Sequence, residues 1–350
     1  MSRIVKIGNV VIGGGNPIAI QSMTNTDTKD VDATVKQIKE LASAGCHIVR
    51  MAVKDKYDAE AVKAIKNEVS AVPLVADIHF DYRLALAAME NGIDKIRINP
   101  GNIGDEGKVK LVADEAKRRS IPIRIGINSG SLEKHLLMKY GHPTPEAMVA
   151  SAMFHVRLLE KYGFEDIVIS LKSSNVKTMY DAYVKMSENT DYPLHLGVTE
   201  AGTMERGSIK SAMGIGGLLL RGIGDTIRVS LTENPVEEIG VAKTILKVAG
   251  YIDEGVDIVS CPTCGRTEID LIGLAKQVEK EFKDKNYNID IAVMGCVVNG
   301  PGEAREADYG IAGGKQVTVL FKKGQIIKKV AESEALEELK KMIEEDMQKK

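Results

Sequence analysis

The chain is poor in cysteine, in surplus charge and in long apolar runs. Its 350 residues contain four cysteines, and its formal net charge is -2 with 27% charged residues. A chain without a positive surplus lacks the field that holds nucleic acid by its phosphates, so we expect no DNA or RNA partner. No apolar run approaches the ~20 residues of a membrane span, and residues 1–15 lack the order of a secretory signal. These absences, together with clustered and reduced thiols, predict a cytoplasmic protein without a membrane partner.

Three of the four cysteines lie in the last quarter of the chain. Cys261 and Cys264 belong to Cys-Pro-Thr-Cys, and Cys296 lies in the glycine-rich segment Met-Gly-Cys-Val-Val-Asn-Gly-Pro-Gly-Glu. A Cys-x-x-Cys pair brings two thiolates to one metal or cluster, and a third cysteine in a turn can fold onto it. No histidine follows His195, so an oxygen ligand or an open position must complete the site. The pattern favours an iron-sulfur cluster with one exchangeable iron.

Residues 17–231 repeat one unit, a β-branched run followed by a turn and an amphipathic helix. Eight units in roughly 250 residues predict an α/β fold, a closed (β/α)8 TIM-like barrel, with an open doubly wound sheet as the alternative. The tail reads as strand, helix, strand, hairpin and helix, which predicts a small α+β domain. We therefore expect a barrel over residues 1–250 and a cysteine-bearing domain over residues 251–350. The eight runs are 18–23, 47–53, 74–79, 95–99, 121–128, 167–172, 194–199 and 226–232.

One face of the predicted barrel strands is polar, although barrel interiors are normally packed with branched apolar residues. Side chains alternate along a strand, so the polar set faces the interior if the apolar set faces the helices. Five strands each contribute one cation, against Asp77 and Glu200 as available acids. The charges either pair among themselves or bind an anion with more than one phosphate, and the positive surplus favours the anion. The polar set is Arg50, Asp77, His79, Arg97, Asn99, Arg124, Asn128, Ser170, Lys172, His195, Arg228 and Ser230.

Several segments together resemble the 4-hydroxy-3-methylbut-2-en-1-yl diphosphate synthase family in its two-domain bacterial form. They are Ile20-Gln-Ser-Met-Thr-Asn-Thr, Ala76-Asp-Ile-His-Phe-Asp, Ile96-Arg-Ile-Asn-Pro-Gly-Asn-Ile-Gly, Ile125-Gly-Ile-Asn-Ser-Gly-Ser, Leu196-Gly-Val-Thr-Glu-Ala-Gly and both cysteine turns. The resemblance covers essentially the whole chain. It implies an iron-sulfur oxidoreductase of the non-mevalonate isoprenoid pathway.

The resemblance implies a two-electron reductive ring opening and dehydration of 2-C-methyl-D-erythritol 2,4-cyclodiphosphate. A substrate-accessible 4Fe-4S cluster, one per chain, would be held by Cys261, Cys264, Cys296 and Glu303. Flavodoxin or ferredoxin would supply the electrons. The chain would form a homodimer in which the cluster domain of one subunit covers the barrel of the other.

The same resemblance assigns roles to the polar barrel residues. Asp77, Asn128 and Glu200 would line the reacting carbons, with Glu200 delivering a proton and Glu303 acting beside its iron. Arg50, Arg97, Arg124, Lys172 and Ser230 would hold the diphosphate, and Asn299 would touch the substrate near the cluster. The inward strand phase adds four further candidate substrate contacts, which are Arg228, His79, Asn99 and His195. Cys46 begins the second strand at the opposite end of the barrel and reads as a small buried residue.

Two other interpretations remain open at the level of sequence. A transferase of the pterin-binding barrel type also presents cations at the barrel rim, but it leaves three cysteines unexplained. Alternatively, the tail is a structural zinc module that docks a partner, and the barrel only binds phosphate. Radical chemistry with S-adenosylmethionine is disfavoured because no Cys-x-x-x-Cys-x-x-Cys occurs.

Overall fold

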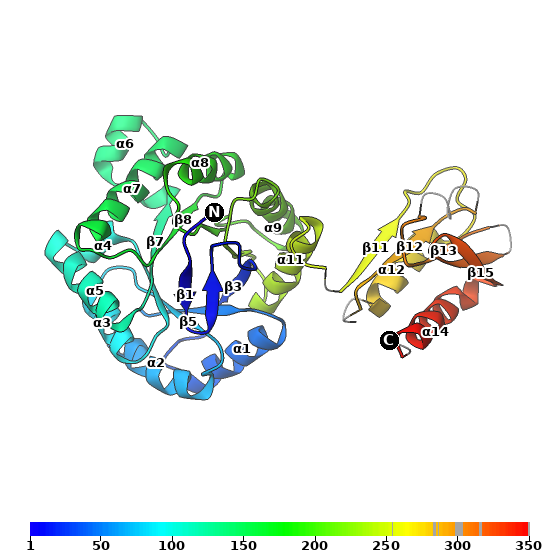
Figure 1. Cartoon of the computed structure of the whole chain (residues 1–350), viewed down its shortest axis with the longest axis horizontal. Coiled ribbons are helices and arrows are strands. Elements are labelled where there is room, and N and C mark those ends of the chain that lie inside the picture. The colour runs from blue at the N-terminus through cyan, green and yellow to red at the C-terminus, as the bar shows by residue number, and fades with distance from the viewer. Residues whose placement is uncertain (254, 283–284, 286, 298–303, 315–316, 349–350) are drawn as a thin grey trace. The chain divides into compact units, whose positions relative to one another are not determined.

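The chain folds into two compact units, Met1–Tyr251 and Ile252–Lys350. The computed structural model describes residues 1–253, 255–282, 285, 287–297, 304–314 and 317–348. Figure 1 shows a ring of helices around strands in the first unit and a single sheet with helices in the second. The sequence places the boundary one residue earlier than the division by contacts.

Eight parallel strands form the barrel of the first unit, in the order β8-β7-β6-β5-β4-β3-β10-β9. A bridge between Ile169 of β8 and Leu194, next to β9, joins the two ends of this order and closes the barrel. The strands are β3 (Ala19–Met23), β4 (Ile48–Ala52), β5 (Leu74–Asp77), β6 (Lys95–Ile98), β7 (Ile123–Asn128), β8 (Ile167–Lys172), β9 (His195–Leu196) and β10 (Thr226–Ile227).

Helices cover the outside of the barrel, and side-chain caps begin several of them. The carboxylates of Asp30, Asp55 and Asp81 each accept hydrogen bonds from backbone N–H groups in the first turn of the following helix, which would otherwise lack partners. The helical segments are α1 (Val31–Ser43), α2 (Lys56–Glu68), α3 (Tyr82–Glu90), α4 (Pro100–Ile103), α5 (Glu106–Arg119), η1 (Ser129–Ser131), α6 (Lys134–Tyr140), α7 (Pro145–Lys161), α8 (Val176–Asn189), α9 (Met204–Ser211), η2 (Ala212–Gly216), α10 (Gly217–Leu219) and α11 (Pro235–Val248).

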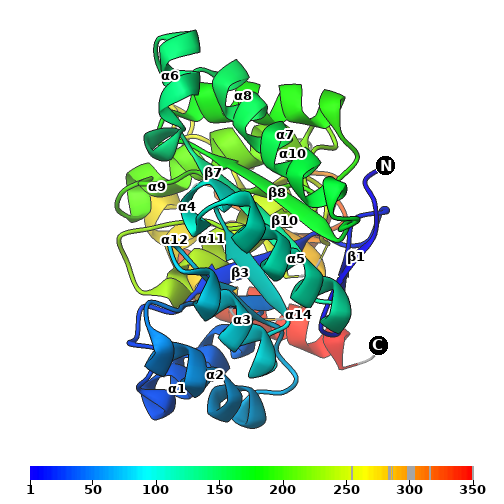
Figure 2. The ribbon, with the colours of Figure 1, turned by 90° about the vertical axis from the view of Figure 1, so that its left-hand side faces the viewer.

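A short hairpin closes the amino-terminal end of the barrel. Strands β1 (Val5–Ile7) and β2 (Val10–Ile12) pair antiparallel, and their apolar residues pack on inward residues of the barrel strands, including Ile48 and Val75. Figure 2 shows the barrel from the side, with β1 near one end and α4, α6 and α9 near the other. The polar site must therefore open toward the carboxyl ends of the strands.

The second unit is a five-stranded mixed sheet in the order β11-β12-β13-β14-β15. The residues of β12 alternate between two apolar clusters, with Ile291 and Val293 in one and Ala292 and Met294 in the other. Helices α12 and α14 contribute to the first cluster. The elements are β11 (Val256–Ser260), α12 (Leu271–Phe282), β12 (Ile289–Met294), β13 (Tyr309–Ala312), β14 (Thr318–Lys322), β15 (Gln325–Val330), η3 (Glu332–Glu334) and α14 (Ala335–Met347).

The predicted fold class, a TIM-like barrel followed by a small α+β domain, is confirmed, and the open doubly wound alternative is wrong. Two details differ from the prediction. Strands β9 and β10 are two residues each, much shorter than the predicted runs. Strand β13 was not predicted, because all four of its residues are buried and it lacks the alternation that marks a half-exposed strand.

Candidate active site

The barrel strands carry a layer of buried cations. Arg50, Arg97 and Arg124 lie on β4, β6 and β7, and all three are at most 8% exposed. Register places Arg97 beside Arg124 across β6 and β7 and beside Asp77 across β5 and β6, while Arg50 pairs with Val75 of β5. Their apolar neighbours, such as Ile96 and Ile98, are fully buried as well. Each strand thus buries an apolar face and a charged face, which is unusual for a barrel.

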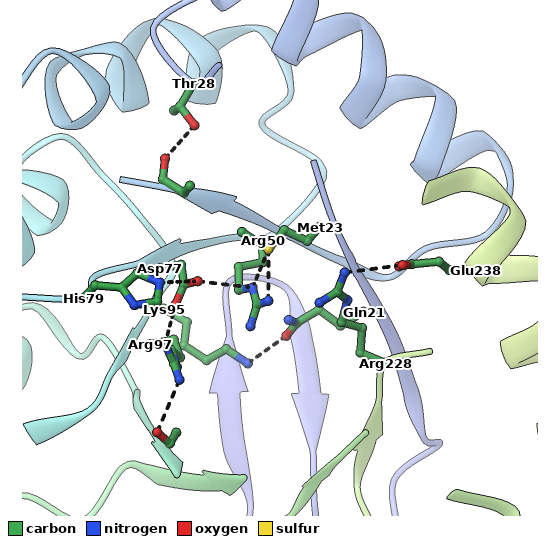
Figure 3. Close-up of polar contacts among 12 residues, drawn as sticks. Gln21, Met23, Thr28, Arg50, Asp77, His79, Lys95, Arg97, Arg228 and Glu238 are labelled. Atoms are coloured by element: carbon green, nitrogen blue, oxygen red, sulfur yellow. Dashed lines mark hydrogen bonds and ion pairs between the residues drawn. The ribbon is translucent and has the colours of Figure 1, made fainter. Parts of the chain in front are cut away.

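Asp77 is the acidic centre of this layer. Its carboxylate accepts a hydrogen bond from Arg97 Nη1 at 3.1 Å, and Arg50 Nε and His79 Nε2 lie 3.9 Å and 3.3 Å from its other oxygen. Burial alone would raise the pKa of Asp77, but Arg50, His79 and Arg97 together hold it well below its usual range. Asp77 therefore remains an anion that orients two arginines (Figure 3).

Arg50 has a soft second partner. Its Nε and Nη2 atoms lie 3.1 Å and 2.9 Å from the thioether sulfur of Met23, on the neighbouring strand β3. A thioether is only a weak acceptor, so this contact leaves the guanidinium ready to exchange it for a stronger one. Burial lowers the pKa of Arg50 to about 10, with Asp77 opposing the shift and Arg228 and Arg97 adding to it.

Arg124 and Lys172 are buried and have no carboxylate partner among the described residues. Arg124 is 0% exposed, and its Nε and Nη1 atoms have no hydrogen-bond partner in the described part of the chain. Burial, with Arg50 and Arg97, lowers its pKa well below the usual range. Burial, with Arg124 and Arg50, lowers the pKa of Lys172 in the same direction. A buried cation without a counter-charge is costly, so this region favours an added anion.

Two further charged residues were missed at the level of sequence. Lys95 on β6 is fully buried, and its Nζ atom is 3.5 Å from Gln21 Oε1 on β3. Glu238 on α11, rather than Glu200, is the second acid, and it accepts from Arg228 Nη2 at 3.3 Å and from Ser22 Oγ at 2.8 Å. Lys95 shares the strand phase of Arg97, so the same alternation could have identified it. Glu238 sits in a helix and carries no such signal.

Two glycines make room for the cations. A β-carbon on Gly126 of β7 would lie 2.2 Å from Arg97 Nε, and one on Gly197 would lie 2.8 Å from Lys172 Nζ. Neither distance is possible without a shift. Gly126 and Gly197 therefore allow Arg97 and Lys172 to occupy the barrel interior.

The remaining predicted residues divide into buried and peripheral groups. His195 is fully buried, with Nδ1 2.7 Å from Thr226 Oγ1, and burial beside Arg124, Lys172 and Lys95 lowers its pKa well below the usual range. Ser170 is buried and donates to the Ile125 carbonyl. Glu200 is exposed and has a left-handed backbone, with φ of 52°. Asn99 is buried, Asn128, Arg228 and Ser230 are half-buried, and the His79 side chain is 51% exposed.

The two cysteine turns lie at one edge of the second sheet. Ser260 pairs with Val293 in the parallel strands β11 and β12, so Cys261 and Cys296 follow these strands at the same end. The N–H of Gly295 donates to Cys261 Sγ at 3.1 Å, and the N–H of Glu268 donates to the Gly295 carbonyl at 3.0 Å. The backbone of Gly295 thus bonds to the first cysteine segment twice, once to the Cys261 sulfur and once to the Glu268 N–H.

The thiols themselves are only partly arranged. Hydrogen bonds from the backbone and side chain of Arg266 lower the pKa of the exposed Cys264 thiol. Across the described residues, no three His, Cys, Asp or Glu side chains are gathered closely enough to hold a metal ion. Glu303 and Asn299 lie outside the described residues. Cys46 is buried just before β4, as expected, and burial raises the pKa of its thiol to about 12.

Comparison with known proteins decides the family. The model described as the GcpE TIM-barrel domain matches residues 2–243, and that of the GcpE protein C-terminal domain matches residues 257–345. The chain belongs to the GcpE family. Two relatives carry the name 4-hydroxy-3-methylbut-2-en-1-yl diphosphate synthase (flavodoxin). The one from Fusobacterium nucleatum is 68% identical over 100% of this chain and 98% of its own length, and the one from Clostridium perfringens is 64% identical over 98% of each.

Solved structures show the barrel of this GcpE-family chain in other proteins. A type I 3-dehydroquinate dehydratase from Clostridium difficile superposes with a TM-score of 0.52 at 15% identity, covering 72% of this chain and 99% of its own. A dihydropteroate synthase from Stenotrophomonas maltophilia gives 0.52 at 12% identity, covering 71% and 99%. At such low identity these likenesses show the fold alone. Among the described residues, no helix is long and apolar enough to cross a membrane.

Proposed function

We propose that this chain reduces 2-C-methyl-D-erythritol 2,4-cyclodiphosphate to 4-hydroxy-3-methylbut-2-en-1-yl diphosphate. The reaction takes up two electrons, opens the cyclic diphosphate and releases water. The observation that carries the proposal is the 68% identity, over the full chain, to a relative named 4-hydroxy-3-methylbut-2-en-1-yl diphosphate synthase (flavodoxin). The chemistry of the site agrees with it, because the barrel buries cations and the second unit brings together turns rich in thiols.

The barrel residues supply the diphosphate site. Six cations, Arg50, Lys95, Arg97, Arg124, Lys172 and Arg228, share two carboxylates, Asp77 and Glu238. A bound diphosphate would accept from the free N–H groups of Arg124 and restore the balance of charge. Asp77 holds Arg97 and Arg50 in place for this purpose. The remaining predicted contacts would bind the rest of the substrate. Asn128 ends β7 and His195 begins β9, whereas His79, Asn99 and Ser230 follow β5, β6 and β10.

The relatives' names specify flavodoxin, so a chain of this family works with a redox-active cofactor. We infer a 4Fe-4S cluster held by Cys261, Cys264, Cys296 and Glu303. The donor set fits, because thiolates suit an iron-sulfur cluster and a carboxylate is a weak fourth ligand that a substrate oxygen can replace. When bound, the cluster supplies electrons to the substrate. Gly295 N–H would then donate to the ligating sulfur of Cys261.

Proton delivery and the partners complete the proposal. The exposed carboxylate of Glu200, which follows β9, is our choice for the proton donor. Asn299 would contact the substrate beside the cluster. We further propose that flavodoxin, or ferredoxin in its place, is the electron donor, and that two chains form a homodimer. Thiolate ligands require a reducing compartment, which is the cytoplasm.

The test begins with anaerobic purification and measurement of iron, acid-labile sulfide and zinc per chain. About four irons and four sulfides, with reduction of the cyclodiphosphate by reduced flavodoxin, are expected. Zinc without sulfide would overturn the cluster and leave the tail as a structural module.

Two variants separate the roles of the two units. Arg124→Ala should weaken substrate binding by about 100-fold, because it removes a charged hydrogen-bond donor worth about 1.5–3 kcal/mol, while iron content stays at the wild-type value. Glu303→Ala should retain a damaged cluster with little turnover. Unchanged substrate binding in Arg124→Ala, or normal turnover in Glu303→Ala, would contradict the assigned role.

A further inference from the structure

The barrel closes between β8 and β9 through an incomplete ladder. The N–H of Ile169 donates to the Pro193 carbonyl at 2.9 Å, and farther along, the N–H of Thr199 donates to the Ser173 carbonyl at 3.3 Å. In a parallel pair the rung between them would run from the N–H of Leu171 to the carbonyl of His195. That direct rung is replaced by a side chain.

The phenol of Tyr183, from α8, fills the missing rung. Its oxygen accepts from the N–H of Leu171 at 3.0 Å and donates to the His195 carbonyl at 2.5 Å. Tyr183 is fully buried, and burial raises the pKa of its phenol, so the group keeps the proton that it donates. Two hydrogen bonds in series span a wider gap than one, so the phenol holds the two strands apart at this level.

The residues around this gap belong to the cationic layer. Lys172 follows Leu171 directly, and His195 itself supplies the accepting carbonyl. Gly197 lies one residue beyond β9, where a β-carbon would collide with Lys172 Nζ. We call the junction of β8 and β9 that Tyr183 bridges the seam. Its width sets the positions of the Lys172 ammonium and the His195 imidazole relative to Arg124, with which both interact electrostatically.

We propose that Tyr183 is a positioning residue, whose hydroxyl spaces β8 from β9 so that Lys172 and His195 face the bound diphosphate. The inference deepens the proposed function and rests on its diphosphate site. Without the hydroxyl, Leu171 N–H and the His195 carbonyl either lose their partner or bond directly and draw the strands together. Both outcomes displace Lys172.

The experiment compares Tyr183→Phe with wild type as the cluster-loaded, full-length enzyme. We expect KM for the cyclodiphosphate to rise about ten-fold with kcat within two-fold, and the dissociation constant for inorganic pyrophosphate to rise by a similar factor. In a Lys172→Met background, Tyr183→Phe should add a clearly smaller increase, because of the two groups that it positions only His195 remains. A KM equal to wild type, or the same ten-fold rise without Lys172, would overturn the proposal.

Tyr192→Phe is the matched control. The Tyr192 phenol is also buried, but its oxygen bonds to Glu160 and Arg3 away from the seam, so KM should stay at the wild-type value. If Tyr183→Phe fails to fold, Tyr183→4-aminophenylalanine keeps the spacing and the donor to the His195 carbonyl but is a poor acceptor for the Leu171 N–H, so KM should rise by less than ten-fold. A folded protein of that kind with KM raised ten-fold or more would also contradict the inference. Wild type that binds pyrophosphate but does not reduce the cyclodiphosphate would refute the proposed reaction and leave the pyrophosphate comparison as the test of the seam.

Discussion

The barrel interior and the cysteine turns organise their polar groups in different ways. In the barrel, side chains contact side chains. The carboxylate of Asp77, for example, pairs with Arg50, Arg97 and His79. In the cysteine turns, backbone N–H groups take part in the bonds: the N–H of Gly295 donates to Cys261 Sγ, and the N–H of Cys264 donates to Thr267 Oγ1. The fold therefore arranges the polar side chains of the barrel directly. It places the cysteine turns at the same end of the second sheet but, among the described residues, gathers no three ligand side chains at metal-binding distance.

This difference agrees with the chemistry of the two ligands that we propose. A diphosphate is recognised by many separate hydrogen bonds, which a rigid barrel can aim in advance. A cluster forms strong bonds to thiolates, so it can draw its ligands into place after the turns have formed. We expect changes in the turns to abolish cofactor loading and changes in the barrel to be graded.

Cys264→Ser should have the largest effect. Serine preserves the size of the side chain but not the soft thiolate ligand, so iron and sulfide per chain should fall to near zero and turnover should be lost. Cys46→Ser is the control, since Cys46 is buried in the barrel beside the Ile48 carbonyl and has no part in the turns. Equal loss of iron in both variants would remove the contrast between the two regions.

Gly126→Ala should disturb the barrel site although no charged residue is substituted. The added methyl group would displace Arg97 and break its bonds to Asp77 and to the Gly126 carbonyl. We expect kcat/KM to fall by about 10- to 100-fold, as for the loss of about 1.5–3 kcal/mol from charged hydrogen bonds, with iron content unchanged.

Gly130→Ala is the matched control for Gly126→Ala. Gly130 lies just after β7, whereas Gly126 lies within it. Alanine at position 130 adds the same methyl group, but nothing lies within 4 Å of it. Kinetics equal to wild type are expected. A similar decrease in both variants would mean that displacement of Arg97 is not the cause of the decrease.

The contrast also explains what could be predicted from the sequence. Alternation along the strands identified Arg50, Arg97 and Arg124 as a buried set, because a strand has only two faces and the other one is occupied by apolar residues. Alternation could not identify Glu238, which reaches the layer from α11, or the phenol of Tyr183 in the barrel seam. Both depend on how a helix packs against the strands, and this packing leaves no local pattern.

In the second unit, the spacing of Cys261, Cys264 and Cys296 predicted one site before any strand was assigned. Short, fully buried strands were hard to predict from the sequence. Strand β13 contains a glycine and no polar position, so its periodicity is invisible. The role of the segment with Glu303 rests on family resemblance, and its position lies outside the described residues.

Lowering the pH should test the contact between Glu133 and His155, which lies outside the layer of barrel cations. Glu133 follows β7 and η1 and accepts from Ser151 Oγ at 3.1 Å, and His155 Nε2 lies 2.7 Å from the same oxygen. Burial raises the pKa of Glu133, but His155, backbone N–H and Ser151 outweigh it and lower the pKa to about 2. A depressed carboxyl pKa stabilises the fold above about pH 4.5, and this contribution is lost as the pH falls toward 2.

Glu133→Gln should therefore be less stable than wild type by about 2 kcal/mol at pH 7, with the difference shrinking below pH 4. Thermal unfolding at a series of pH values measures this difference. Glu60→Gln, at an exposed site on α2, should follow wild type throughout. A constant gap across the whole range would show that the carboxylate charge is not the cause.

The smallest effect concerns backbone strain at Glu200. Its φ of 52° is rare for a residue with a β-carbon, which costs about 1–2 kcal/mol, and glycine adopts it freely. Glu200→Gly and Glu200→Ala should lose turnover equally, because both lack the carboxylate, yet Glu200→Gly should unfold with about 1 kcal/mol more stability. Equal stability would mean that position 200 carries no strain, whereas the expected order would show that the barrel rim tolerates an unfavourable backbone to place a carboxylate there.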